Sequence, residues 1–273
     1  MRVDIATEPG SPDKPNEDYA ATGPNIVVVL DGQTARTGTG CIHGVAWYSA
    51  RVAEAIIENA ALGPTKALSA AITRTADLHR DTCDLSHPGT PSAAVAVVQL
   101  DGDTLRYLVL GDVTVVLDSG TDVRVISDHR VSQTALAERA IADAMPADSP
   151  EKPAALVRMK HAELAARNTP GGFWVAATEP TASEHALTGE FAIAEVQRVA
   201  VLSDGATRAV EAFELYGWTE LLDILNTSGP GELIKQVRAA EASDQTATRW
   251  PRNKLSDDAT AVYCVVGFQS LRA

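Results

Sequence analysis

The sequence predicts a single α+β domain in which helices cover antiparallel sheets. Segments rich in β-branched residues follow one another with short joints between residues 93 and 126, which is typical of antiparallel strands. Apolar residues with helical spacing precede and follow this region, interrupted by short apolar strands. No linker, low-complexity stretch or internal repeat divides the 273 residues, so one domain over 1–273 is expected.

The first part of the chain is expected to form two short strands and two helices. A β-branched run at 26–30 stops at an Asp-Gly pair and predicts a buried strand, with a shorter strand candidate at 19–22. Apolar residues at helical spacing then predict helices over 45–61 and from 65 to about 83.

The middle of the chain is expected to be an antiparallel meander. Two of its joints, at 101–103 and 118–120, contain glycine and suit tight hairpins. The meander strands are expected at 93–100, 104–110, 113–117 and 122–126.

Helices and short strands alternate in the rest of the chain, apart from a loop-like stretch at 178–188. The expected helices are 132–144, 153–166, 207–213, 219–225 and 232–242, and the expected strands are 173–177, 199–203 and 259–266.

The charge excludes some partners. The formal net charge is -13, so the protein repels nucleic-acid backbones and anionic lipid surfaces. We therefore expect no nucleic-acid and no membrane partner. Nothing in the sequence indicates an oligomeric state.

Cysteine usage points to a reduced protein, and the sequence carries no paired-histidine motif for zinc. Cys41, Cys83 and Cys264 form no C-x-x-C pair and are expected to be mostly buried thiols. The six histidines form no H-x-x-x-H or similar pair, which argues against a zinc site. The first residues lack a signal-like apolar stretch and no apolar run approaches about 20 residues, so a cytoplasmic protein is expected.

Acidic residues sit at the ends of several apolar strands. Asp31 and Asp204 follow strands, the pair Asp257-Asp258 precedes one, and Glu17-Asp18 adjoins the strand candidate at 19–22. Taken alone, each is a turn or a solvated loop. Because strands of one core place their ends near each other, these carboxylates are expected to converge, and a cation would then neutralise them.

The kind of ligand narrows the choice of cation. Carboxylate oxygens without paired histidine or cysteine suit hard ions such as Mg²⁺ or Mn²⁺. Gly32 adds a backbone carbonyl, because glycine lets the chain approach an ion closely.

Six short motifs in order resemble those of the metal-dependent protein phosphatases of type 2C. The match runs from residue 16 to 260, and the fold it implies is a four-layer α-β-β-α sandwich of two antiparallel sheets flanked by helices. The motifs are Asn16-Glu17-Asp18, Val29-Leu30-Asp31-Gly32, Gly89-Thr90-Pro91-Ser92-Ala93, Leu110-Gly111-Asp112, Leu202-Ser203-Asp204-Gly205 and Asp257-Asp258-Ala259-Thr260.

The resemblance implies a role for each acid. Asp31 would bridge two divalent cations, Mn²⁺ or Mg²⁺. Glu17 and the Gly32 carbonyl would complete one site. Asp204 and Asp257 would complete the other, with Asp258 as the alternative ligand to its neighbour.

Two further acids have supporting roles in this reading. Asp112 would help to hold a weaker third ion, and Asp18 would orient the attacking water. The resemblance implies hydrolysis of phosphoserine or phosphothreonine in a phosphoprotein substrate by a water activated between the two cations, without a covalent intermediate. A mobile flap is expected within 145–198.

The phosphate-binding part of the pattern departs from the family. Asp13 stands where the family usually has a phosphate-binding Arg, Gln33-Thr34-Ala35 replaces a His-Gly-Gly sequence, and Val113 replaces a Ser. These changes leave the expected metal ligands intact but alter the pocket for the substrate phosphate.

Four cations are candidates for the missing phosphate contact. Lys14 and Arg36 are nearest to the motifs, and ordinary solvated charges are the alternative reading for both. Arg249 and Arg252 lie in a basic loop just before Asp257, where charge compensation of the acids is the alternative.

Two rival classes of protein share part of this pattern. Haloacid-dehalogenase-like phosphatases require a nucleophilic Asp two residues before Asp31, where this chain has Val29. A pseudophosphatase, which would bind a phosphoprotein with little turnover, stays open because of Asp13.

Overall fold

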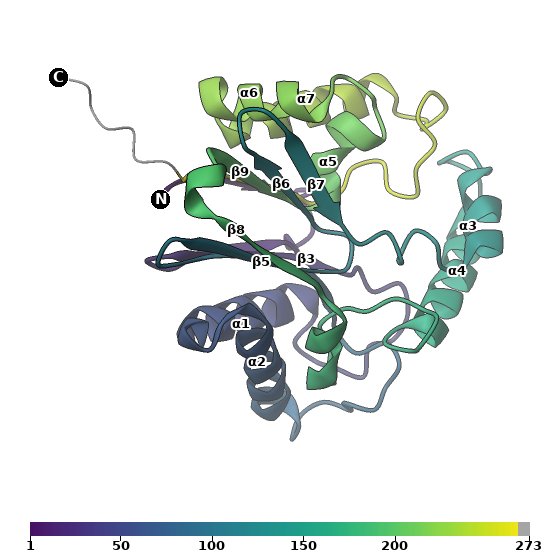
Figure 1. Cartoon of the computed structure of the whole chain (residues 1–273). Coiled ribbons are helices and arrows are strands. Elements are labelled where there is room, and N and C mark those ends of the chain that lie inside the picture. The colour runs from purple at the N-terminus through teal and green to yellow at the C-terminus, as the bar shows by residue number, and fades with distance from the viewer. Residues whose placement is uncertain (267–273) are drawn as a thin grey trace.

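The computed structural model describes residues 1–266, which form two five-stranded antiparallel sheets packed face to face (Figure 1). The strands of sheet B follow one another in sequence order, whereas those of sheet A do not. Sheet A runs β1 (Arg2–Glu8), β10 (Ala259–Val265), β9 (Arg198–Leu202), β6 (Thr114–Asp118) and β7 (Val123–Ser127). Sheet B runs β2 (Tyr19–Thr22), β3 (Ile26–Gly32), β4 (Ala93–Asp101), β5 (Thr104–Leu110) and β8 (Leu187–Ala192).

Helices cover the outer faces of both sheets and confirm the expected four-layer sandwich (Figure 1). Below sheet B lie α1 (Val45–Glu58) and α2 (Pro64–His79); above sheet A lie α5 (Asp204–Glu211), α6 (Trp218–Ser228) and α7 (Pro230–Ser243). At one end of the sandwich, α3 (Leu136–Asp143) packs on α4 (Lys152–Ala166). Short 3-10 helices span Ala60–Leu62, Pro180–His185 and Ile193–Glu195.

The central strands are apolar throughout because both of their faces are buried. In β3, Val28 and Leu30 pack toward α1 and α2, whereas Val27 and Val29 pack between the sheets. Side chains of a strand point alternately to opposite faces, so one strand serves two core layers. None of the helices in residues 1–266 has the length and apolar character needed to cross a bilayer.

The expected helices are confirmed, but the meander prediction was wrong at one joint. Both glycine hairpins are present, joining β4 to β5 and β6 to β7. Between them, Gly111 has a φ of 82°, and the chain turns from sheet B into sheet A instead of pairing β5 with β6. The local sequence predicts a strand on each side of this joint, but tertiary packing determines which sheet each strand joins.

Two edge strands escaped prediction and one expected strand is wrong. β1 and β8 lie at sheet edges, where half-exposed strands carry a weak apolar signal. Residues 173–177 are instead a buried segment with isolated bridges from Phe173 to Arg167 and from Ala176 to Ala93. They are apolar because they are buried, and β4 is already paired along most of its length by β3 and β5.

Candidate functional site

Four acids from different strand ends line one cavity of about 270 Å³. Asp31 lies near the end of β3, and Asp112 lies in the turn after β5. Asp204 is the first residue of α5 after β9, and Asp257 precedes β10. The backbone N–H of Asp204 donates to Oδ2 of Asp31 over 3.1 Å. The two sheets therefore bring their acid-bearing ends to a common place.

Two glycines allow the backbone segments to approach this closely. A Cβ on Gly32 would lie 2.5 Å from the carbonyl oxygen of Glu17, and a Cβ on Gly205 would lie 2.0 Å from that of Asp258. No side chain fits at such distances. The Asp-Gly pairs that look like turns in the sequence thus place β3 against Glu17 and α5 against the segment before β10.

The electrostatics of the cavity disfavour bare carboxylates. Burial, followed by repulsion from Asp204, raises the pKa of Asp31 well above its usual range and that of Asp112 to about 7. Burial and repulsion from Asp257 also raise the pKa of Asp204. Within residues 1–266, no Lys, Arg or His forms a salt bridge with Asp31, Asp112 or Asp204. These three groups are stable as anions only if a cation joins them.

Asp257 differs because two side-chain cations already pair with it. Lys254 Nζ lies 2.6 Å from its Oδ1, and Arg208 Nη2 lies 3.0 Å from its Oδ2. Burial lowers the pKa of Lys254, but Asp257 and Asp204 outweigh this and raise it above the usual value. The ammonium of Lys254 is therefore a fixed charge beside the acid cluster.

Asp258 organises the backbone and does not line the acid-lined cavity. Its Oδ1 accepts from the N–H of Gly10 over 2.8 Å, and its Oδ2 accepts from the N–H of Glu17 over 2.7 Å. The side chain of Glu17 in turn accepts from Thr34 Oγ1 over 2.5 Å, and burial raises its pKa. Of the two adjacent acids, Asp257 is the one that lines the same cavity as Asp31 and Asp204.

Asp18 is buried beside this group. Burial, followed by repulsion from Asp204 and Asp258 that Ser203 and Thr260 partly offset, raises its pKa to about 8. Its Oδ2 atom has no hydrogen-bond partner among the described residues. An unpartnered buried carboxylate oxygen is costly, so this atom is available to a water or an ion.

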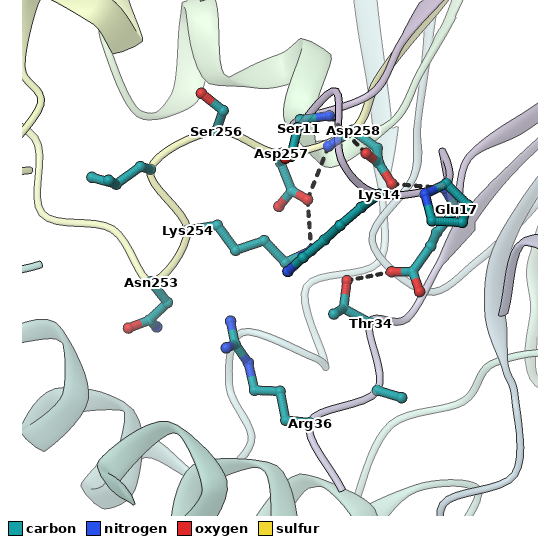
Figure 2. Close-up of a pocket in the computed structure, with 14 residues that line it drawn as sticks. Ser11, Lys14, Glu17, Thr34, Arg36, Asn253, Lys254, Ser256, Asp257 and Asp258 are labelled. Atoms are coloured by element: carbon teal, nitrogen blue, oxygen red, sulfur yellow. Dashed lines mark hydrogen bonds and ion pairs between the residues drawn. The ribbon is translucent and has the colours of Figure 1, made fainter. Parts of the chain in front are cut away.

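A second cavity, of about 560 Å³, adjoins the first and carries cations. Figure 2 shows Lys14, Arg36 and Lys254 pointing toward its middle, with Asp257 in contact with Lys254 and Glu17 on another side of the cavity. Arg36 lines both cavities and forms no salt bridge within residues 1–266. The site therefore has an acid-lined part and a cation-lined part in contact. Asp13 is exposed and lines neither cavity.

The two arginines expected to bind substrate are placed differently. All five N–H donors of Arg252 are used, by the Oδ2 and carbonyl of Asp244 and by three other backbone carbonyls. Arg249 is exposed, lies over the Trp250 ring at 4.1 Å and lines neither cavity. Arg252 lines the acid-lined cavity, but its donors are all directed at Asp244 and backbone carbonyls and none at the acids.

Several residues that line the acid cavity were not expected from the sequence. Lys160 and Glu163 come from α4, which lies within the expected flap at 145–198. The Nζ atom of Lys160 lies 3.8 Å from Oε2 of Glu163. Arg208 comes from α5. Helical spacing predicts both helices, but nothing local indicates that these faces turn toward Asp31. The rest of the expected flap includes β8, an edge strand of sheet B.

The oxygen ligands fit divalent cations in kind, but two adjustments are needed before an ion can bind. Asp31, Asp112, Asp204 and Glu17 offer hard oxygen ligands whose raised pKa values a cation would lower. In the described part of the chain, no three acids bring ligand oxygens within 4.8 Å of one another. Asp257 must also exchange its contact with Lys254 for an ion. Ion binding here therefore requires the acid side chains to move closer together.

Comparison with known proteins reveals the fold. No protein-family model matches the sequence, and no curated protein matches it. Among solved structures, the chain is similar to the serine/threonine phosphatase Stp1 from Staphylococcus aureus, with 14% identity and a TM-score of 0.58 over 98% of this chain and 95% of that one.

Two other structures give the same result. The PPM Ser-Thr phosphatase MsPP from Mycobacterium smegmatis, in complex with cacodylate, is 17% identical with a TM-score of 0.55, covering 98% and 99% of the two chains. The catalytic domain of the phosphatase PstP, in complex with two manganese ions, is 16% identical with a TM-score of 0.55, covering 97% and 98%. The chain therefore has the fold of PPM-type serine/threonine phosphatases.

Proposed function

We propose that this protein is a metal-dependent phosphatase that hydrolyses phosphoserine or phosphothreonine in proteins with the help of two Mg²⁺ or Mn²⁺ ions. One observation carries the proposal: acids from four strand ends line one cavity, and the three half-buried ones, Asp31, Asp112 and Asp204, have no cationic partner within residues 1–266. A cluster of this kind is costly to fold unless cations neutralise it in the working protein.

In this proposal each acid has its own role in holding the metal ions or the attacking water. Asp31 would bridge the two ions, Glu17 and the Gly32 carbonyl would hold one, Asp204 and Asp257 the other, and Asp112 a weaker third. Bound divalent cations would polarise the phosphoryl group and lower the pKa of a water. The unpartnered Oδ2 of Asp18 is an acceptor that can orient that water.

Arg36 and Lys14 would receive the phosphate. Both line the larger cavity, and the guanidinium of Arg36 has no ion-pair partner within residues 1–266. A guanidinium offers two parallel N–H donors to a phosphate, and a neighbouring ammonium adds charge. These two side chains would replace the Arg that the family pattern leads one to expect at Asp13.

Hydrolysis of a chromogenic phosphate ester with and without Mn²⁺ tests the proposal. We expect Mn²⁺-dependent turnover that falls at least about 100-fold in Asp31→Asn, because that substitution removes the bridging charge. The matched control is Asp122→Asn, which changes an exposed acid in the β6–β7 turn. Equal rates for the wild type and Asp31→Asn would contradict the proposal.

A second candidate, a pseudophosphatase that binds a phosphoprotein with little turnover, is favoured by two ion pairs of Asp257. Lys254 and Arg208 already supply positive charge to Asp257, as a cation would. Under this reading the wild type shows no Mn²⁺-dependent turnover but still binds a phosphoserine peptide. Binding and turnover measured on the same peptide distinguish the two functions.

The setting we propose is the cytoplasm, with a phosphoprotein as the partner. Thiols stay reduced there. This fits Cys41 and Cys83, which are half-buried and unbonded.

A further inference from the structure

Away from the acid cluster, two cysteines and a histidine from distant parts of the chain meet. Cys41 lies in the loop between β3 and α1, His79 is the last residue of α2, and Cys83 lies in the turn that follows. Their ligand atoms all lie within 4.8 Å of one another, and no other group of three potential ligands in residues 1–266 does so. We propose that Cys41, His79 and Cys83 bind a zinc ion, with water in the fourth position.

The distances suit this ion. Zinc binds thiolate at about 2.3 Å and imidazole at about 2.0–2.1 Å, so tetrahedral geometry separates sulfur from nitrogen by roughly 3.6 Å. Cys41 Sγ lies 3.5 Å from His79 Nδ1. The two sulfurs lie 2.9 Å apart, and zinc would separate them to roughly 3.8 Å. One small rotation of a cysteine side chain supplies that difference.

A disulfide is the competing use of the two sulfurs. It would require them to close to about 2.05 Å, a shift of similar size in the other direction. His79 favours the metal. The residue is 1% exposed, and its Nδ1 faces Cys41 Sγ. A disulfide has no use for this imidazole, whereas zinc binds it directly.

The surroundings hold the three ligands in place. The N–H of Cys83 donates to the carbonyl of His79 over 2.9 Å, so the last turn of α2 sets the spacing of these two ligands. The N–H of Asp84 donates to the carbonyl of Gly40 over 2.8 Å, which brings the Cys41 loop alongside. The ring of Trp47 covers His79 at 5.2 Å between centroids. The ligands are therefore oriented before an ion arrives.

The zinc would fasten the loop after β3 to the end of α2. That loop also carries Thr34, which hydrogen-bonds Glu17, and Arg36, which lines both cavities. A metal at this point would stabilise the backbone that presents these two residues, although it takes no part in the chemistry.

Metal content of the intact protein, purified without chelator from zinc-supplemented cells, tests the proposal. We expect about one zinc per chain in the wild type and nearly none in Cys41→Ser or Cys83→Ser. Cys264→Ser is the matched control, because Cys264 is buried in β10 away from the cluster. Asp31→Asn should keep its zinc, which separates this site from the acid cluster.

Cobalt replacement and thiol counting keep the proposal testable if a variant fails to fold. Co²⁺ added to the zinc-free wild type should give thiolate-to-cobalt charge-transfer absorption, and denatured, chelated protein should show all three thiols free. Zinc content that is unaffected by both cysteine substitutions overturns the proposal. So does a wild type without zinc, whether Cys41 and Cys83 are free or joined as a disulfide.

Discussion

The ammonium of Lys254 lies 2.6 Å from the carboxylate of Asp257, in the wall shared by the two cavities. This contact places a cationic side chain where the proposed metal ligands converge. In the absence of metal, Lys254 offsets part of the charge of Asp257 and Asp204. A metal ion must compete with it for Asp257.

Replacing Lys254 with Met should strengthen metal binding. Without the ammonium, Oδ1 of Asp257 becomes free to ligate while Oδ2 stays paired with Arg208, and we expect the apparent Kd for Mn²⁺ to fall about tenfold, a free-energy change of about 1.4 kcal/mol. Isothermal titration calorimetry measures this directly. Lys235→Met, which removes an exposed charge on α7, serves as the control. An unchanged Kd in Lys254→Met would mean that the lysine moves away without cost.

Replacing Arg36 with Ala should weaken substrate binding more than turnover. The guanidinium is the candidate phosphate donor, so we expect KM for a phosphoserine peptide to rise about 10-fold or more, with a smaller change in kcat. Steady-state kinetics separate the two effects. Arg249→Ala should leave KM unchanged, because that side chain lies over Trp250 outside both cavities. A larger rise in KM for Arg249→Ala than for Arg36→Ala would instead indicate that Arg249 binds the substrate.

Replacing Arg252 with Ala should destabilise the fold. The substitution leaves Asp244 and several backbone carbonyls without their buried donor, and we expect Tm to fall on the order of 5–10 °C. Differential scanning calorimetry tests this against Arg249→Ala, for which we expect little change. A stable Arg252→Ala protein with a raised KM would show that the arginine serves the substrate after all.

The stability of the metal-free protein should fall as pH rises. The folded-state pKa is raised to about 7 for Asp112 and to about 8 for Asp18, above the unfolded values near 4. The folded state therefore binds more protons between these values, and stability is fully present below about pH 4 and lost as pH rises toward 8. Each group contributes at most about 1.4 kcal/mol per pH unit.

Urea unfolding in chelator across pH 5 to 8 measures this slope. Saturating Mn²⁺ should reverse it, because bound cations favour the ionised carboxylates. Asp112→Asn should flatten the slope of the metal-free protein. A stability that rises with pH in chelator would argue that these acids are already compensated by other groups.

Much of the architecture could be predicted because the strong signals are local. The run at 26–30 and the strand before Asp204 are apolar on both faces, and the helices at 45–58 and 64–79 keep regular spacing. The edge strand β8 has the sequence LTGEFA, which carries no such signal. The switch of sheets at Gly111 depends on what β5 and β6 meet in three dimensions, which no local pattern encodes.

The site was partly predictable for the same reason. Asp31 and Asp204 stand beside glycines that are needed for close backbone approach, so their short motifs carry real geometric content. The partners of Arg252 lie in a folded loop, and its five donors look available in the sequence. His79 and Cys41 are separated by a strand-to-helix loop and two helices, so motif spacing could not reveal that they meet.

Sheet A is completed out of sequence order, because β10 inserts between β1 and β9. Asp258, just before β10, also gathers the amides of Gly10 and Glu17. A nascent chain emerging from the ribosome therefore carries Glu17, Asp31, Asp112 and Asp204 long before the strand that draws them together. The acid cluster therefore assembles late in folding. Until β10 pairs with β1 and β9, these negative charges stay apart and do not repel one another in the growing chain.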